Sequence, residues 1–180
     1  MYTELSRDYE KVVTIDNPIY QSFQGRYFLG QSELITFGHD TYAFGSLYNP
    51  IHSGVNLFIS VSTITNTSKI AFKSRPYMNA RIPSGGSIVE NITPANLVTI
   101  PQPVSKIKFI TGQFKEPIQG GVKAYTRMIP AESTLANEKD GKFVIPPGSN
   151  FMLVLVPPTD TDIQADIAYG FWTEKYTCKL

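Results

Sequence analysis

Apolar and polar residues alternate with a period of two along much of this chain. The alternation is clearest in the segments 55–62, 106–109 and 163–171. Successive side chains of a strand point to opposite faces of a sheet, so this period predicts half-buried β-strands. The residues that the pattern places in the core are Val55, Leu57, Ile59, Val61, Phe151, Leu153, Leu155, Ile167, Phe171 and Trp172.

The segment 151–156 differs from the others because it is apolar at every position. A strand that is apolar on both faces needs cover on both, so this segment is predicted to be a central strand. A Pro-rich loop separates it from the strand predicted over 163–171. We expect these two strands to form a closing hairpin.

Turn-forming residues interrupt the apolar segments at short intervals, with NP at 49–50, GG at 120–121, DG at 140–141 and PPG at 146–148. Glycine accepts the positive φ that hairpin turns require, so the DG pair predicts a hairpin and Gly148 is predicted to have positive φ. Many short strands with regular turns and few helix signals predict an all-β fold, a two-sheet antiparallel sandwich of jelly-roll type.

The first residues of the chain precede the first clear strand. We predict an N-terminal arm over residues 1–24 and a single sandwich domain over residues 25–180, because no linker divides the rest. The arm is richer in aromatic and β-branched residues than disordered segments are. Its apolar residues, among them Val12, Val13 and Ile15, either pack on their own domain or add a strand to the sheet edge of a neighbouring subunit.

The charges of the chain nearly cancel, since 16 Lys and Arg face 15 Asp and Glu, for a formal net charge of +1. This balance argues against nucleic acid or an anionic membrane as the main partner, because both favour a basic face. Charged residues make up only 17% of the chain, against about 25% in ordinary proteins. Such a surface has little long-range repulsion, so copies of the chain itself are the predicted partner.

The chain has one cysteine, Cys178, so it forms no internal disulfide. Cys178 is either a free thiol or a cross-link between subunits. The N-terminal residues lack the basic and apolar regions of a secretory signal, and no apolar run approaches the ~20 residues of a membrane helix. We therefore expect synthesis in the cytoplasm without a classical signal, or a mature form whose signal is gone, and no membrane insertion.

Candidate catalytic and metal-binding residues are few. The two histidines, His39 and His52, adjoin Asp40 and Ser53 in sequence, but a Ser-His-acid triad requires a particular geometry that neighbours in a turn do not establish. The histidines lack the spacing of a zinc site, and the carboxylates near residue 160 lack the calcium-loop pattern. We predict that the chain is not an enzyme and holds no metal or cofactor.

Aromatic residues make up 12% of the chain. Exposed tyrosines can stack on sugar rings, and the best candidates for a sugar-stacking platform are Tyr42, Phe44 and Tyr48. Aromatic side chains at half-buried strand positions are equally typical of core and edge packing. Carbohydrate is therefore the second candidate partner.

Seven short motifs form a recognisable set: NP (49–50), SGVNLF (53–58), ITNTS (64–68), GG (120–121), RMIP (127–130), DGKFVIPPG (140–148) and AYGFWTE (168–174). Together they resemble a small uncharacterised domain family of spore-forming Firmicutes, over about residues 26–174. The last strand of that family ends in two tryptophans, and here Phe171 takes the first position. The family has no established activity, so the resemblance implies no catalytic residues; it implies a link to spores or the cell surface.

The Pro-Pro-Gly turn, the apolar strand and the closing Gly-aromatic-Trp strand are also similar to jelly-roll subunits of endospore appendages and phage particles. Such subunits assemble by strand exchange, and appendage subunits lack classical signals because they are made inside the mother cell. We interpret the chain as a non-enzymatic structural protein that self-assembles into a spore-surface layer or appendage filament. Strand addition would use Val12, Val13 and Ile15, with Cys178 as the candidate cross-link. The alternative is a carbohydrate-binding or adhesive module of phage origin.

Overall fold

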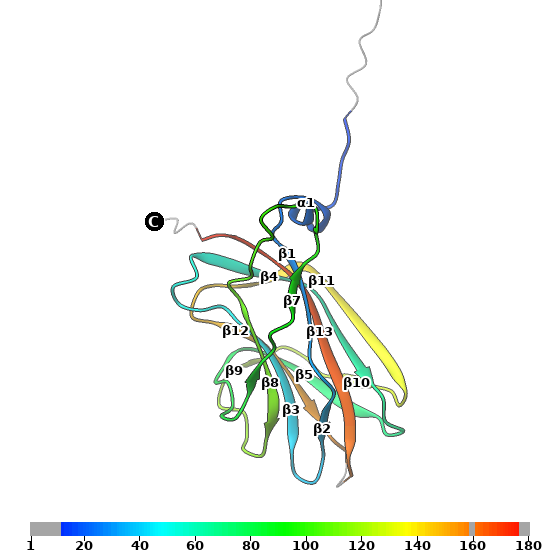
Figure 1. The fold of residues 1–180 in the computed structure, drawn as a ribbon. Coiled ribbons are helices and arrows are strands. Elements are labelled where there is room, and N and C mark those ends of the chain that lie inside the picture. The colour runs from blue at the N-terminus through cyan, green and yellow to red at the C-terminus, as the bar shows by residue number, and fades with distance from the viewer. Residues whose placement is uncertain (1–11, 159–160, 177–180) are drawn as a thin grey trace, which may run out of the picture.

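The strands of the protein form two antiparallel sheets that pack face to face (Figure 1). The structure is a computed structural model that describes residues 12–158 and 161–176. In chain order its elements are α1 (Asn17–Phe23), β1 (Tyr27–Gln31), β2 (Ile35–Phe37), β3 (Tyr42–Tyr48), β4 (Val55–Asn66), β5 (Phe72–Ala80), β6 (Ser87–Ile88), β7 (Ile92–Pro94), β8 (Lys108–Phe114), β9 (Gly120–Lys123), β10 (Arg127–Ile129), β11 (Ser133–Ile145), β12 (Asn150–Val156) and β13 (Ile163–Lys175).

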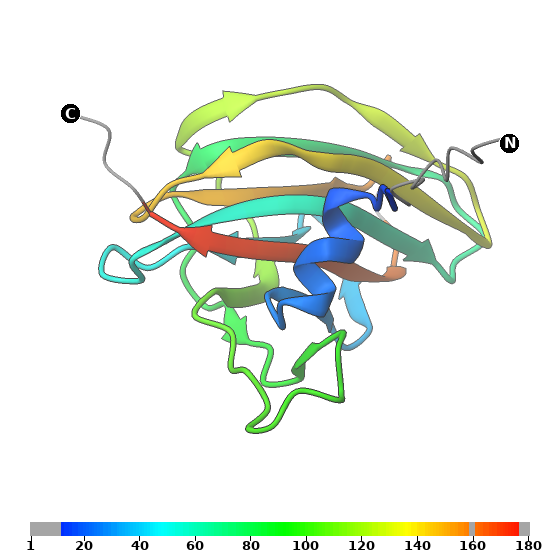
Figure 2. The same cartoon turned by 90° about the horizontal axis from the view of Figure 1, so that it is seen from above.

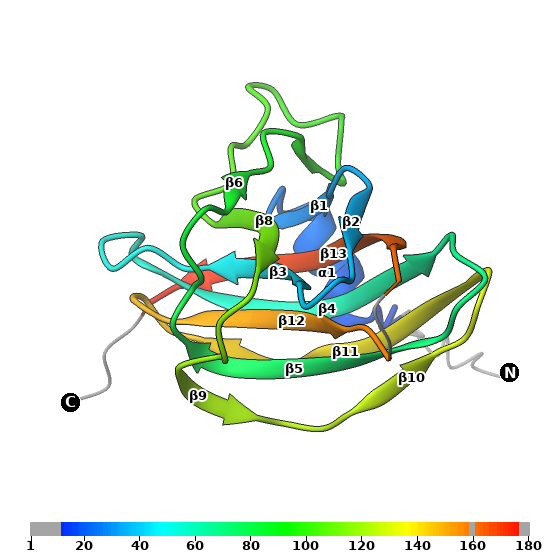
Figure 3. The same cartoon turned by 90° about the horizontal axis from the view of Figure 1, so that it is seen from below.

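The first sheet has the strand order β11-β4-β13-β1-β7, and β2 pairs with the start of β13 beyond the end of β1. The second sheet has the order β10-β5-β12-β3-β8-β6, and β9 pairs with β5 on the same side as β10. Figures 2 and 3 show these layers from opposite directions.

The connections between the strands are those of a jelly roll. Four neighbouring strands of the first sheet run in the order β1-β13-β4-β11, and four of the second run β3-β12-β5-β10. The chain crosses between the sheets from β3 to β4, from β4 to β5, and again along β11, β12 and β13. Eight strands joined in this way make two Greek keys. The predicted all-β sandwich of jelly-roll type is therefore confirmed.

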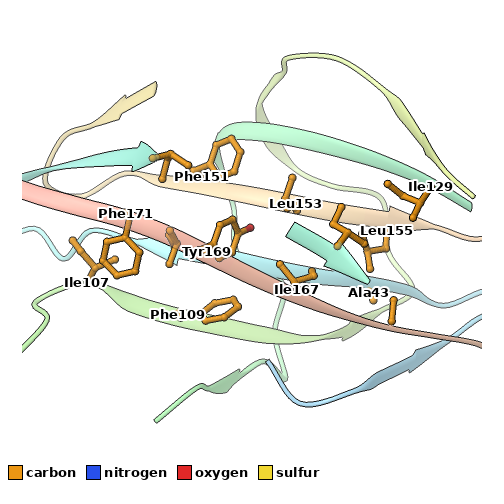
Figure 4. Close-up of a cluster of buried hydrophobic side chains, with 14 of the residues drawn as sticks. Ala43, Ile107, Phe109, Ile129, Phe151, Leu153, Leu155, Ile167, Tyr169 and Phe171 are labelled. Atoms are coloured by element: carbon orange, nitrogen blue, oxygen red, sulfur yellow. The ribbon is translucent and has the colours of Figure 1, made fainter. Parts of the chain in front are cut away.

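The core lies between the two sheets and is built from the inward side chains of both (Figure 4). Aromatic rings contact one another there, with Phe109 and Phe151 each packing edge-on against Tyr169. The inward residues of β12 and β13 that the alternation predicted, together with Leu57 and Ile59 of β4, are buried. Trp172 is also buried, but on the outer face of the first sheet, where its ring stacks on Phe58.

A β-bulge at Ser60 corrects the prediction for Val61. Ile59 pairs with Phe171 and Val61 pairs with Gly170, so β4 has one residue more than β13 at this point. An extra residue shifts every later side chain to the other face of the strand. The side chain of Ser62 therefore points into the core and is buried, whereas Val61 lies half-buried on the outer face of the sheet.

The connection between β12 and β13 corrects a second prediction. β12 pairs with β3 and β5 in the second sheet, whereas β13 pairs with β1, β2 and β4 in the first. The expected closing hairpin is therefore wrong, because the Pro-rich loop carries the chain from one sheet to the other. The prediction that β12 is central and covered on both faces is confirmed: Phe151 packs in the main core, and Met152 packs in a second cluster on the outer face.

The C-terminal part of the predicted arm forms the helix α1, which packs against β1 and β13 (Figure 2). Proline in its first turn favours the start of the helix, because that turn needs no backbone donor there. Gln21 is buried and donates a hydrogen bond from Nε2 to Glu174 Oε1 at 2.9 Å. Residues 17–23 are thus attached to the sandwich, although they lie within the range predicted as the arm.

Candidate functional site

The helix α1 and the loop 95–106 between β7 and β8 lie together at one end of the sandwich (Figure 1). Both carry exposed apolar side chains. The loop reaches the end of the helix, since Asn96 Nδ2 donates to Phe23 O at 3.4 Å. We call these side chains the apolar cap, and they are Ile19, Tyr20, Phe23, Leu97, Val98, Ile100 and Val104.

The loop is held in shape by its polar residues. Asn96 Oδ1 accepts a hydrogen bond from the Val98 backbone N–H at 3.0 Å, and Gln102 Nε2 donates to the carbonyl oxygens of Leu97 and Thr99 at 2.7 and 2.9 Å. The apolar side chains of the loop point outward instead: Val98 is 87% exposed and Ile100 is 91% exposed. Exposed apolar patches of this kind mark protein–protein or membrane contacts.

The described part of the arm is a second exposed apolar segment. Residues 12–16 lead into α1 without regular structure. Val12 is 80% exposed, Val13 is 71% exposed and Ile15 is 44% exposed. These predicted self-assembly residues are therefore not buried against their own domain. The fourth, Cys178, lies outside the described residues.

The three aromatic residues predicted to stack on sugar do not form one exposed platform. All three lie on β3 and point to the outer face of the second sheet, but Phe44 is fully buried in the outer cluster. A buried ring has no face left for a sugar, so the prediction for Phe44 is corrected. Tyr42 is half-buried and stacks on Phe114 at a centroid distance of 5.3 Å, whereas Tyr48 lies at the other end of the strand.

The histidines occupy turns at opposite ends of β3. His39 lies before the strand, with its Nε2 at 3.4 Å from Asp162 Oδ1, and His52 lies in the turn after it. Ser53 is buried, and its hydroxyl lies beside the backbone of Val55. Within residues 12–158 and 161–176, no group of three or more His, Cys, Asp or Glu side chains could hold a metal ion.

One buried cation lies inside the sandwich and was not singled out from the sequence. Lys139 sits in the irregular part of β11, and its Nζ donates to Ser62 Oγ at 2.6 Å and to the carbonyl oxygen of Asn137 at 3.0 Å. The same Nζ lies 5.6 Å from the centre of the Phe151 ring. Burial, and to a smaller extent the charge of Arg127, lower the pKa of Lys139 to about 8. Its protein contacts satisfy the ammonium group, so we interpret Lys139 as structural.

The apolar cap was also missed, although the sequence contained a signal for it. Pro101 and Pro103 exclude a regular strand between Leu97 and Val104, because proline cannot donate to a β-ladder. Apolar residues that no strand or helix can bury remain on the surface. In the described ranges, no helix is long and apolar enough to span a membrane.

The sequence matches the model of a family of unknown function (DUF6143) over residues 1–179. No curated protein and no solved structure matches the chain. The family match covers the arm and both sheets together.

Proposed function

The chain belongs to the family of unknown function DUF6143, and we propose that it is a non-enzymatic structural protein that self-assembles. The observation that carries this proposal is the exposure of Val12 and Val13, which are 80% and 71% exposed in a segment that leads into α1 without regular structure. The proposed partner is a second copy of the chain. Its formal net charge is only +1, so two copies repel each other little.

The energetics indicate how much surface the assembly needs. Full burial of a side chain the size of valine or isoleucine contributes about 1.5–3 kcal/mol, so Val12, Val13 and Ile15 together contribute about 4.5–9 kcal/mol. Association costs about 4–15 kcal/mol in lost translational and rotational freedom. The arm side chains alone would therefore bind weakly. Burial of the apolar cap, or the backbone hydrogen bonds of an added strand, supplies the remainder.

The arrangement of the arm suits strand addition. Side chains of a strand alternate between its faces, so Val13 and Ile15 would share one face and Val12 would occupy the other. An added strand at a sheet edge has one face toward the partner's core. The jelly-roll fold, the exposed arm and the resemblance to appendage subunits support assembly into a spore-surface layer or an appendage filament.

The test replaces both arm valines with aspartate and measures the molar mass of the purified protein by light scattering. Both side chains are exposed in the monomer, so Val12→Asp with Val13→Asp should change its stability by no more than about 0.5 kcal/mol. We expect the double variant to stay monomeric at concentrations where the unmodified chain assembles. The matched control is Val122→Asp, because Val122 is 68% exposed and lies on β9 of the other sheet.

The proposal fails if the double variant and the unmodified chain have the same mass at every concentration. It is also contradicted if Val122→Asp abolishes assembly while the arm variant does not, since the contact would then lie on the edge formed by β9. The double substitution Val98→Asp with Ile100→Asp, made in a chain with an unmodified arm, tests the apolar cap separately. It should weaken assembly.

A further inference from the structure

A second feature of the surface lies on the outer face of the second sheet, away from the arm. The segment 115–119, which we call the strap, joins β8 on one side of this sheet to β9 on the other (Figure 3). Phe114, the last residue of β8, and Ile118 of the strap pack against the outer cluster that contains Val154. The strap therefore passes over the outer faces of β3, β12 and β5.

A cavity of about 270 Å³ opens beside the strap. Its floor consists of Tyr42 of β3 with Val154 and Val156 of β12, and Arg75 and Tyr77 of β5 line it as well. The strap contributes one cation and one carboxylate, Lys115 and Glu116, both exposed. The cavity has the volume of about nine molecules of liquid water. This space admits one small ring-bearing molecule.

Arg75 is the unusual residue of this cavity. It lies opposite Val154 in the ladder between β5 and β12, and its Nε is buried without a hydrogen-bond partner. Within the described part of the chain, the side chain of Arg75 has no hydrogen bond or ion pair with another residue, although its backbone belongs to the ladder. An arginine stays charged at all physiological pH values, and its planar fork of donors matches a carboxylate. A partly buried guanidinium without a partner is therefore prepared to bind an anion.

The other lining residues restrict the kind of anion. Val154, Val156 and the Tyr42 ring, which already stacks on Phe114, form an apolar floor that a bare inorganic ion would leave uncovered. Tyrosine rings pack against the apolar faces of flat or ring-shaped ligands and offer a hydroxyl at the edge. A neutral sugar would cover the floor but leave the Arg75 charge unpaired, which is costly in a partly desolvated site.

We propose that this cavity binds a carboxylate-bearing sugar ring, with the carboxylate on Arg75 and the ring against Tyr42 and Tyr77. Lys115 adds attraction for the anion from the strap. Glu116 lies beyond ion-pair distance of the Arg75 guanidinium and is free to turn to solvent, since it is exposed. The site is separate from the proposed assembly surface and does not depend on it.

Saturation-transfer NMR with D-glucuronate tests this inference on the full chain, because the method works for monomers and assemblies alike. D-glucose keeps the ring without the carboxylate, and acetate keeps the carboxylate without the ring. We expect glucuronate to bind, and each of the other two to bind at least about tenfold more weakly, the loss expected for a missing charge-assisted contact. Equal binding of glucose or of acetate, or no binding of glucuronate, would overturn the proposal.

Two variants of Arg75 identify the residue that carries the binding. Arg75→Gln should weaken glucuronate binding by about tenfold or more, and Arg75→Lys should recover only part of it, because an ammonium cannot form the bidentate contact. The matched control is Lys108→Gln, which removes one exposed cation from the far end of β8. A melting curve of each variant establishes that it is folded. Unchanged glucuronate binding in folded Arg75→Gln would place the ligand elsewhere and refute the assignment.

Discussion

A methyl group added at Gly141 tests how tightly the irregular part of β11 packs on Trp172, the single tryptophan of the chain. Gly141 has φ of +75°, and an added Cβ would lie 2.1 Å from Trp172 Cη2 and 2.4 Å from Cζ2. The indole cannot withdraw easily, because it is 1% exposed and stacks on Phe58 with a centroid distance of 5.3 Å and an interplanar angle of 1°.

The magnitude follows from two separate costs. A non-glycine residue in the left-handed region costs roughly 1–2 kcal/mol, and overpacking of a closely packed site costs roughly 1–3 kcal/mol. Gly141→Ala should therefore lower the free energy of unfolding by about 2–5 kcal/mol. For a domain of this size each kcal/mol lowers Tm by about 2–4 °C, so the expected loss is about 4–20 °C.

Gly54→Ala is the matched control, because Gly54 has φ of +68° and an added Cβ would meet nothing within 4 Å. It should show the backbone cost alone, a loss of about 2–8 °C. Thermal unfolding followed by circular dichroism gives both values. The fluorescence of Trp172 should shift to longer wavelength only in Gly141→Ala, since only that change displaces the indole. Equal melting temperatures and equal emission in the two variants would refute the tight contact.

Three further substitutions test other parts of the structure by urea unfolding. Lys139→Met should stabilise the protein at pH 7, because the folded state lowers the pKa of Lys139 from 10.5 to about 8. Between about pH 8 and 10.5 the unfolded state binds more protons than the folded state, so the unmodified chain should become more stable as pH rises. The stability difference between Lys139→Met and the unmodified chain should therefore shrink over that range. A constant difference would exclude titration of Lys139 as its cause. Gly148→Val should cost about 1 kcal/mol or more, because Gly148 has φ of +82°; an unchanged midpoint would contradict that geometry. Asn49→Ala should cost about 2 kcal/mol or more, because Asn49 Nδ2 donates to the carbonyl oxygens of Val55 and Ile145, which would lose their buried partner; a cost below about 0.5 kcal/mol would show that water replaces the amide.

The sequence predicts the fold class because alternation and turn chemistry are local properties. The positive φ predicted for Gly148 is present, and 151–156 is the doubly covered strand that its composition predicted. The bulge at Ser60 was not predictable, because it shows only where β4 pairs with β13. The pairing partner of each strand was also not predictable. A short Pro-rich loop can connect two strands of a hairpin or two strands of different sheets.

The candidate surfaces were predictable to different degrees. Val12 and Val13 are exposed and do not pack on their own domain, but that a neighbouring subunit receives the arm remains a prediction. The ring of Phe44 is covered by Phe114 and by the backbone near Gly86 and Gly112, which come from distant parts of the chain. From the sequence, Arg75 resembles an ordinary solvent-facing residue of a strand, and only the structure shows that the strap lies beside it. Local patterns contain no information about such cover.

The most direct test of the assembly hypothesis compares the full chain with a chain lacking residues 1–15, by light scattering over a range of concentrations. This deletion keeps α1, which packs against the sandwich through Gln21 and Glu174, so the shortened chain should retain its fold and melting temperature. The account predicts a mass that grows with concentration for the full chain and a constant monomer mass for the shortened one. A full chain that remains monomeric at high concentration, or a shortened chain that assembles equally well, would contradict it.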